Sequence, residues 1–229
     1  MAIEYEKRQK EKEKIIKKSY NMELVFESEW LNVYDNVLEK SYCDQLKEHQ
    51  SNQLFVQPLK ASKDPLKSRT STVSFVPNDD PIDNIINQKT FELTSIPVEQ
   101  YEETSVIRYQ LNQEYQHHHD YFVPQHPDWE KEMKNGGNRI LSAIFILDGN
   151  CEGGETHFPF LDDLKIKPKT GRCIIYQNIW LMESVGKVIA KYNERSYHAG
   201  LPVTAGEKWI ATKWIRSSHM QDSSVANIF

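Results

Sequence analysis

The stretch Ile140-Leu-Ser-Ala-Ile-Phe-Ile-Leu147 is apolar at nearly every position, which is the pattern of a central strand covered on both faces. From Thr104 onward, other short runs of strand character surround it, separated by turns that contain Gly, Pro and Asn. The other predicted strands are Ser105–Leu111, Tyr115–Phe122, Glu155–Phe158, Leu164–Ile166, Arg172–Tyr176, Ser196–His198 and Lys208–Arg216. Short strands spaced in this way predict two packed β-sheets, the jelly roll or double-stranded β-helix.

The N-terminal half adds helices beside this β core. Leu31–Leu38 predicts a strand that turns into a helix, with Ser41 as the helix cap. Pro81–Leu93 carries isoleucines at helical spacing. The fold class is therefore mainly β with flanking helices, in which N-terminal helices support a jelly-roll core.

Length and composition fit one domain with charged or loose ends. The chain has 229 residues, of which 38% are hydrophobic, which suffices for a sizeable core. We expect a charged helical arm at 1–20, one domain at 21–216 and a C-terminal tail at 217–229. The oligomeric state stays open.

The same composition excludes several classes of partner. A net charge of −5 gives no sign of nucleic-acid binding, because phosphate binders usually carry basic domains. No apolar run approaches the roughly 18 residues of a membrane span, and the charged start does not resemble a signal peptide. Three widely spaced cysteines indicate neither a disulfide framework nor a zinc ribbon. We therefore expect a protein of the reducing cytoplasm, without a membrane partner.

The run Tyr115-Gln-His-His-His-Asp-Tyr-Phe122 contains a histidine and a carboxylate two residues apart. Side chains i and i+2 of a strand share a face, so His118 and Asp120 can bind one metal ion while His117 and His119 point away. Such a pair alone is more often structural. With His198 as a distant third ligand, it predicts the two-histidine, one-carboxylate site of non-haem Fe(II) enzymes.

Lys208 is the second chemical signal. It alternates with Ile210, Thr212 and Trp214 on an apolar strand face, where an unpaired ammonium would cost several kcal/mol. That cost disappears if the carboxylate of an anionic cosubstrate lies opposite. Trp214 itself fits a core position as well as a functional one.

Ordered motifs between about residues 30 and 216 resemble the prolyl 4-hydroxylase family of Fe(II)/2-oxoglutarate dioxygenases. The matching segments are Arg108-Tyr109, Gln113–Phe122, Asn138-Arg139, Gly153–Pro159, His198–Val203 and Gly206–Ile215. Upstream, Tyr34–Leu38 and Arg69–Thr72 are similar to the opening of the family's domain and to its substrate loop.

The resemblance implies a role for each matching residue. His118, Asp120 and His198 would be the catalytic metal ligands. Three further residues would bind 2-oxoglutarate: Tyr109, Thr156 and Lys208. Three others would frame the substrate near the metal: Tyr115, Arg139 and Trp214.

The implied reaction is hydroxylation of proline at C4 in a peptide or protein, coupled to decarboxylation of 2-oxoglutarate to succinate and CO2. It would require Fe(II), O2 and ascorbate as the reductant. Two alternatives remain, namely the same chemistry on another residue or a small molecule, and a non-catalytic peptide-binding jelly roll. An intact set of ligands and anchor argues against the last.

Three departures from the family pattern accompany this match. Asn112 stands where the family usually has glycine before the metal strand, and asparagine tolerates the left-handed backbone that such a turn needs. The segments 124–137 and 177–193 are longer than usual, and we expect both to border the mouth of the site.

Overall fold

The computed structural model describes residues 22–56, 68–184 and 187–220. The predicted arm at 1–20 lies outside these residues, as does most of the predicted tail. At the start of that tail, the backbone N–H of Ser217 donates to the Asn138 carbonyl at 2.9 Å, and that of Met220 donates to the Glu99 carbonyl at 2.8 Å.

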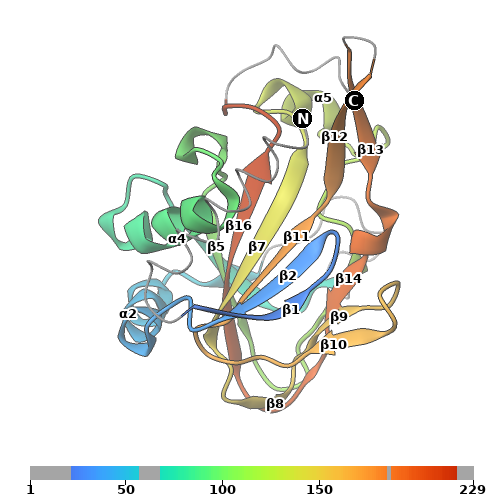
Figure 1. Ribbon diagram of the computed structural model, residues 1–229. Helices are drawn as coiled ribbons and strands as arrows, with labels where there is room; N and C mark the ends of the chain where they lie inside the picture. Colours follow the sequence, from blue (N-terminus) through green and yellow to red (C-terminus); the bar gives the residue numbers. More distant parts are fainter. Residues whose placement is uncertain (1–21, 57–67, 185–186, 221–229) are drawn as a thin grey trace.

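A large antiparallel sheet forms the centre of the molecule (Figure 1). Its strands are, in spatial order, β1 (Glu23–Glu27), β2 (Leu31–Asp35), β11 (Cys173–Gln177), β7 (Arg139–Asp148), β16 (Lys208–Arg216), β5 (Thr104–Tyr109), β4 (Thr72–Val76) and β3 (Phe55–Val56). The apolar segment Ile140–Leu147 lies within β7, between β11 and β16, which confirms the prediction of a central strand.

A smaller sheet packs against the large one and completes the jelly roll. Its strands are β10 (Leu164–Ile166), β9 (Thr156–Phe158), β14 (His198–Gly200) and β6 (Tyr115–His118). Two further antiparallel pairs are β12 (Ile179–Ser184) with β13 (Lys187–Tyr192), and β8 (Cys151–Gly153) with β15 (Val203–Gly206).

The two faces of the large sheet bury different cores. On β7, Phe145 and Leu147 belong to the core beneath the helices, whereas Ile144 and Ile146 belong to the core between the sheets. This alternation follows from the two-residue period of a strand. Both faces of β7 are thereby removed from water, which is why its sequence is apolar almost throughout.

The helices cover the face of the large sheet that points away from the small sheet (Figure 1). They are α2 (Lys40–Gln50) and α4 (Asn84–Thr94). The short helix α5 (Trp129–Lys134) lies apart from these two, towards β12 (Figure 1). Turns of 3-10 helix occur at Pro81–Asp83, Val98–Gln100 and Glu194–Ser196. The expected cap at Ser41 is wrong, because α2 begins after Glu39 and Ser41 lies within it. Among the described residues, no helix has both the length and the apolar character needed to cross a membrane.

Several predicted boundaries shift. The strand expected at Tyr115–Phe122 ends at His118, and the one expected at Ser196–His198 begins at His198 after a 3-10 turn. The longer segments take their own structure, with α5 inside 124–137 and the β12–β13 hairpin inside 177–193. Asn112 has φ of 62°, so asparagine does supply the left-handed turn before β6.

A buried ion pair joins β16 to the helical layer. The Nζ of Lys213 lies 2.8 Å from Asp83 Oδ2, and both side chains have 0% exposure. Thr104 Oγ1 donates to the other carboxylate oxygen at 2.6 Å, and Asn78 Oδ1 accepts a second hydrogen bond from the ammonium at 2.7 Å. The pair is thus fully hydrogen-bonded inside the core.

Replacing Asp83 by alanine is expected to lower the free energy of unfolding by about 3–5 kcal/mol, because it leaves the Lys213 ammonium buried without its counter-ion. Urea unfolding followed by circular dichroism measures the loss. Asp44→Ala is the control, since it breaks the exposed pair with Lys40 and should have a far smaller effect. Equal losses in the two variants would contradict the expectation.

Candidate metal centre

His118 and His198 are brought together by the pairing of two strands of the small sheet. In the antiparallel pair of β6 and β14, His198 lies directly opposite His118. Their ring centroids are 4.4 Å apart. Strand pairing therefore places two imidazoles, 80 positions apart in the chain, side by side on one face.

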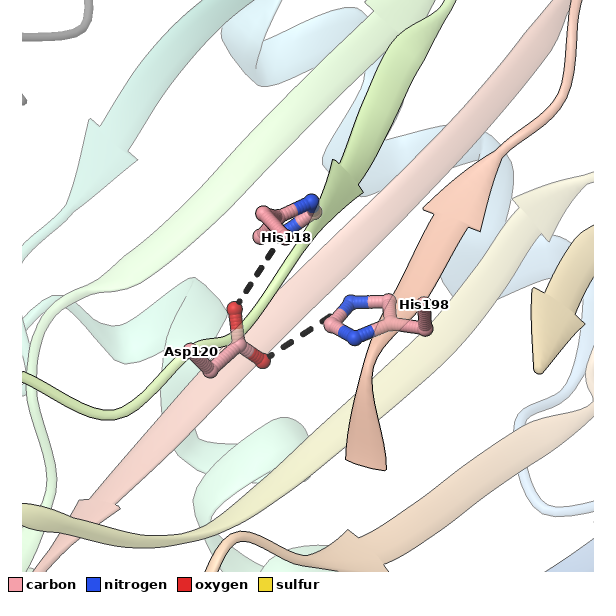
Figure 2. A group of neighbouring side chains, drawn as sticks. All are labelled: His118, Asp120 and His198. Carbon is pink, nitrogen blue, oxygen red and sulfur yellow. Dashed lines mark ion pairs between the residues drawn. The ribbon is translucent and has the colours of Figure 1, made fainter. Parts of the chain in front are cut away.

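Asp120 reaches the histidines from a bend just after the end of β6, not from the strand itself. Its Oδ1 lies 3.5 Å from His118 Nε2, and its Oδ2 lies 4.0 Å from His198 Nε2 (Figure 2). One ligand atom from each of the three residues falls within 4.8 Å of the others. The three donors thus converge on one point, although the carboxylate arrives by a different backbone path from the predicted one.

The histidine rings are oriented by their own backbone. His118 Nδ1 lies 2.7 Å from the carbonyl of Gln116, and His198 Nδ1 lies 2.9 Å from the carbonyl of Ser196. A carbonyl only accepts hydrogen bonds, so each Nδ1 carries the proton and each Nε2 keeps a free lone pair. This is the tautomer that a metal ligand needs.

Charge in the centre also suits a cation. Burial lowers the pKa of His198 to about 4, so this ring is neutral at neutral pH. Burial by itself would raise the pKa of Asp120, but its attraction to His198 and His118 outweighs burial and keeps that pKa well below the ordinary value. The centre therefore offers a neutral imidazole and one carboxylate anion that is 6% exposed.

A pocket runs from these ligands into the jelly roll. It is lined by Ile107, Tyr109, Tyr115, His118, Asp120, Ile144, Thr156, Tyr176, His198, Ala199, Gly200, Lys208, Ile210, Thr212 and Trp214. Eight of the nine predicted site residues are in this set, and the predicted alternation of β16 is confirmed at all four positions from Lys208 to Trp214. His117 and His119 do not line it, as expected from strand geometry.

Lys208 lies deep in the pocket, opposite Tyr109 in the pairing of β16 with β5. Lys208 is 2% exposed, and its Nζ donates to the carbonyl of Gly154 at 2.6 Å. No carboxylate of the described residues lies within 4.0 Å of this ammonium. Lys213 on the same strand, by contrast, has Asp83 as its counter-ion.

The ammonium of Lys208 can therefore bind an anion that none of the described residues supplies. A buried cation without a counter-ion is unfavourable, and burial accordingly lowers the pKa of Lys208 to about 8. Thr156, the third predicted cosubstrate residue, is also buried and lines the same pocket.

Two of the three predicted substrate residues, Tyr115 and Trp214, line the same pocket as the candidate metal ligands. Tyr115 stacks on His118 with ring centroids 3.6 Å apart and planes 14° apart. Trp214 lines the pocket, and its Nε1 is buried without a hydrogen-bond partner among the described residues.

Arg139 lies just outside the pocket. Its guanidinium forms two hydrogen bonds with Glu102, of 2.7 and 2.8 Å, and its Cζ lies 3.8 Å from the centroid of the Trp214 ring. Arg139 therefore lies against the Trp214 ring, and Glu102 holds its guanidinium in that position.

Two hydroxyls at the centre were not predicted from the sequence. Ser142 Oγ and Tyr176 Oη each donate to Asp120 Oδ2 at 2.6 Å. Arg69, in the segment that resembles the family's substrate loop, places its guanidinium over the Tyr115 ring at 5.2 Å. Neither hydroxyl stands in a chemical pattern along the chain. Only the β11 alternation, which turns Ile174 and Tyr176 to one core, could have indicated that Tyr176 points inward.

A jelly roll that carries two histidines, one carboxylate and a buried lysine is the arrangement expected of a non-haem Fe(II) oxygenase. Comparison with known proteins agrees, since residues 104–216 match the family model of the 2OG-Fe(II) oxygenase superfamily. Arabidopsis thaliana "Probable prolyl 4-hydroxylase 10" is 30% identical over 208 residues, which cover 81% of this chain and 68% of the relative. "Prolyl 4-hydroxylase 1" of the same plant is 33% identical over 148 residues, covering 59% of this chain and 48% of the relative.

A solved structure is similar over nearly its whole length. The viral collagen prolyl hydroxylase vCPH of Paramecium bursaria Chlorella virus-1, in complex with 2OG, has a TM-score of 0.61 and 29% identity, covering 84% of this chain and 98% of that one. The chain belongs to the prolyl 4-hydroxylase family of 2OG-Fe(II) oxygenases and is a 2-oxoglutarate-dependent dioxygenase.

The residues present fit both groups that this family uses. The Nε2 lone pairs of the two histidines and the Asp120 carboxylate suit Fe(II). The Lys208 ammonium, which has no carboxylate partner in the part of the chain that the structure describes, suits the dicarboxylic acid 2-oxoglutarate.

Binding of 2-oxoglutarate is expected to weaken as pH rises through about 8. In the folded protein Lys208 has a pKa of about 8, so it loses its positive charge as the pH rises through this value. In the unfolded chain the same group has a pKa of 10.5. The unfolded chain therefore binds the extra proton between these values, so stability should rise with pH over the same window in which affinity for the cosubstrate falls. Calorimetric titration of the Mn(II)-loaded protein at pH 7, 8 and 9 measures the affinity. 2-Oxobutyrate, which lacks the distal carboxylate, should show no such change, and a parallel loss for both acids would contradict the assignment.

Proposed function

We propose that this enzyme hydroxylates C4 of proline in an extended peptide or protein and consumes one 2-oxoglutarate and one O2 per turnover. One oxygen atom enters the proline and the other enters succinate, and the 1-carboxylate of 2-oxoglutarate leaves as CO2. The observation that carries the proposal is one pocket that contains both the His118, Asp120 and His198 donors and the buried Lys208 ammonium, which has no carboxylate counter-ion among the described residues.

We assign Fe(II) to His118 Nε2, Asp120 and His198 Nε2. Three protein ligands on one side leave the other positions free for cosubstrate and O2. Bound there together with 2-oxoglutarate, the iron supplies the oxidising chemistry that converts a C–H bond to C–OH. Ascorbate is the proposed reductant that returns iron to the ferrous state.

At the deep end of the pocket, Lys208 holds the distal carboxylate of 2-oxoglutarate through a charge-assisted hydrogen bond. Tyr109 lies across from it in the strand pair and is 3% exposed, so the carboxylate is shielded from water. Thr156 adds a buried hydroxyl to the same pocket. These three residues orient the cosubstrate so that its keto-acid end points toward the metal ligands.

At the metal end, the substrate contacts are Tyr115 and Trp214. The Tyr115 ring, fixed by its stacking on His118, offers an aromatic surface for a proline ring. Trp214 also lines the pocket and offers a second aromatic side chain against which a polyproline II segment packs. The Arg139 guanidinium lies against the Trp214 ring and fixes the plane of the indole.

The three cysteines support a reducing compartment. Cys43, Cys151 and Cys173 are all free thiols, and Cys43 and Cys173 have 0% exposure. We infer a cytoplasmic enzyme from this, since secreted proteins of this size commonly use disulfides.

The test combines purified protein with Fe(II), 2-oxoglutarate, ascorbate, O2 and proline-rich peptides. Mass spectrometry should show that each modified peptide gains one oxygen atom, and succinate should form in equal amount. NMR of the product should place the hydroxyl at C4 of proline.

His119→Ala is the matched control for His118→Ala, because the neighbouring ring does not line the pocket. His119→Ala should retain turnover and His118→Ala should not. Succinate that forms equally well without any proline peptide would move the assignment to another substrate, and peptide binding without turnover would favour a binding module.

A further inference from the structure

Tyr176 reaches the metal centre from the large sheet, on the side facing the two histidine strands. It lies on β11, has 1% exposure and packs edge-on against Phe158 with ring centroids 5.2 Å apart. Its hydroxyl donates to Asp120 Oδ2 at 2.6 Å and lies 2.9 Å from His198 Nε2. Neither the Fe(II) assignment nor the cosubstrate assignment uses this residue.

Ser142 approaches the same carboxylate oxygen from β7. Its Oγ donates to Asp120 Oδ2 at 2.6 Å, and Asn178 Nδ2 donates to that Oγ at 2.8 Å. Asn178 thereby fixes the direction in which the serine hydroxyl can donate. Asp120 Oδ2 thus receives two hydroxyl donors from two different strands.

The two donors make the oxygens of Asp120 unequal. A carboxylate oxygen has two lone-pair sites, so Oδ2 is saturated by the two hydroxyls. Oδ1 is the oxygen that faces His118 Nε2, at 3.5 Å (Figure 2). Oδ1 is therefore the oxygen left for a metal ion.

We propose that Tyr176 is a positioning residue that, together with Ser142, makes Asp120 a one-oxygen ligand. The inference rests on the proposed function, in which Asp120 binds Fe(II). A carboxylate restricted to one oxygen leaves an additional position on the metal free, and the reaction needs such positions for 2-oxoglutarate and O2. Hydrogen-bonded partners behind a ligand commonly tune metal affinity in this way.

Tyr176 differs from Ser142 because it also faces His198. The Nε2 of His198 has no proton to donate, since Nδ1 carries it toward the Ser196 carbonyl. The single hydroxyl proton of Tyr176 therefore has two acceptors within 2.9 Å. When Nε2 binds a metal ion, that proton is left entirely to Asp120, so metal binding and the Tyr176–Asp120 hydrogen bond reinforce each other.

A phenylalanine would fill the same volume, which makes the hydroxyl testable on its own. Titration with Mn(II) under anaerobic conditions, followed by electron paramagnetic resonance of the free ion, measures affinity without turnover. Tyr176→Phe is expected to bind Mn(II) about 10- to 100-fold more weakly. Ser142→Ala should weaken binding in the same direction from an independent strand.

Tyr42→Phe is the matched control, because it removes another buried tyrosine hydroxyl, bonded to the Ile82 carbonyl at 2.7 Å, far from the centre in the helical layer. It should bind Mn(II) like the wild type. Tyr176 and Ser142 donate to the same oxygen. The loss of Mn(II)-binding free energy in the double variant should therefore differ from the sum of the losses in the two single variants. Additive losses would count against a shared target.

Two results would overturn the inference while leaving the function intact. One is wild-type Mn(II) affinity in Tyr176→Phe. The other is a phenolate-to-iron charge-transfer absorption in the ferric wild type that disappears in Tyr176→Phe, since it would make Tyr176 a direct ligand. A wild type that binds no Mn(II) at all would instead overturn the metal site itself, and the proposed function with it.

Discussion

Asp120→Ala is expected to weaken Fe(II) binding by more than about 100-fold and to abolish succinate production. Asp120 is the one acidic residue among those that line the pocket, so its loss leaves two imidazoles and no anion to balance the metal charge. The expected loss exceeds the 10- to 100-fold that is typical of removing a partner behind a ligand. Anaerobic titration with Fe(II), read by equilibrium dialysis, measures it.

The control for this variant is His119→Ala, one residue away in the chain. His119 stacks on Tyr121 with ring centroids 4.5 Å apart and takes no part in the pocket. It should bind Fe(II) like the wild type. Unchanged Fe(II) affinity in Asp120→Ala would show that the carboxylate is not a ligand.

Lys208→Met is expected to weaken 2-oxoglutarate binding while making the ligand-free protein more stable. Removing one member of a desolvated charge pair costs about 2–5 kcal/mol of binding free energy, or roughly 30-fold or more in Kd. In the free protein, however, the same ammonium has no carboxylate counter-ion among the described residues. Its replacement by an apolar chain of similar length therefore removes an unfavourable burial.

The opposite signs of these two effects are what identify Lys208 as a ligand anchor. Calorimetric titration with 2-oxoglutarate and urea unfolding of the ligand-free protein measure them on the same preparation. The comparison is Asp83→Ala, where the ion pair is internal and only stability should fall. A Lys208→Met protein that is less stable and keeps full cosubstrate affinity would make Lys208 a structural residue.

The convergence of His118, Asp120 and His198 could be predicted from their residue types and from the two-residue spacing of the first two. The alternation of β16 likewise placed Lys208 and Trp214 on one face, and both line the pocket. The spacing of His118 and Asp120 suggested a continuous strand, yet β6 ends at His118 and a bend delivers the carboxylate. The convergence was predicted correctly for a partly wrong reason.

The supporting contacts could not be predicted, because they depend on which strands become neighbours. Ser142 and Tyr176 lie in apolar runs, where the sequence alone predicts ordinary core positions. Their contact with Asp120 depends on the pairing of β7 with β11 opposite the small sheet. Arg139 lies outside the pocket, where Glu102, 37 positions away, holds its guanidinium against the Trp214 ring. Long-range pairing of this kind leaves no local pattern in the sequence.

An anomalous difference map at the iron edge, from crystals grown anaerobically with Fe(II) and 2-oxoglutarate, tests the metal site most directly. We predict one peak in direct contact with His118 Nε2, Asp120 Oδ1 and His198 Nε2, with the distal carboxylate of 2-oxoglutarate at Lys208 Nζ. A stoichiometrically bound iron whose peak lies elsewhere, or a cosubstrate anchored away from Lys208, would contradict the account.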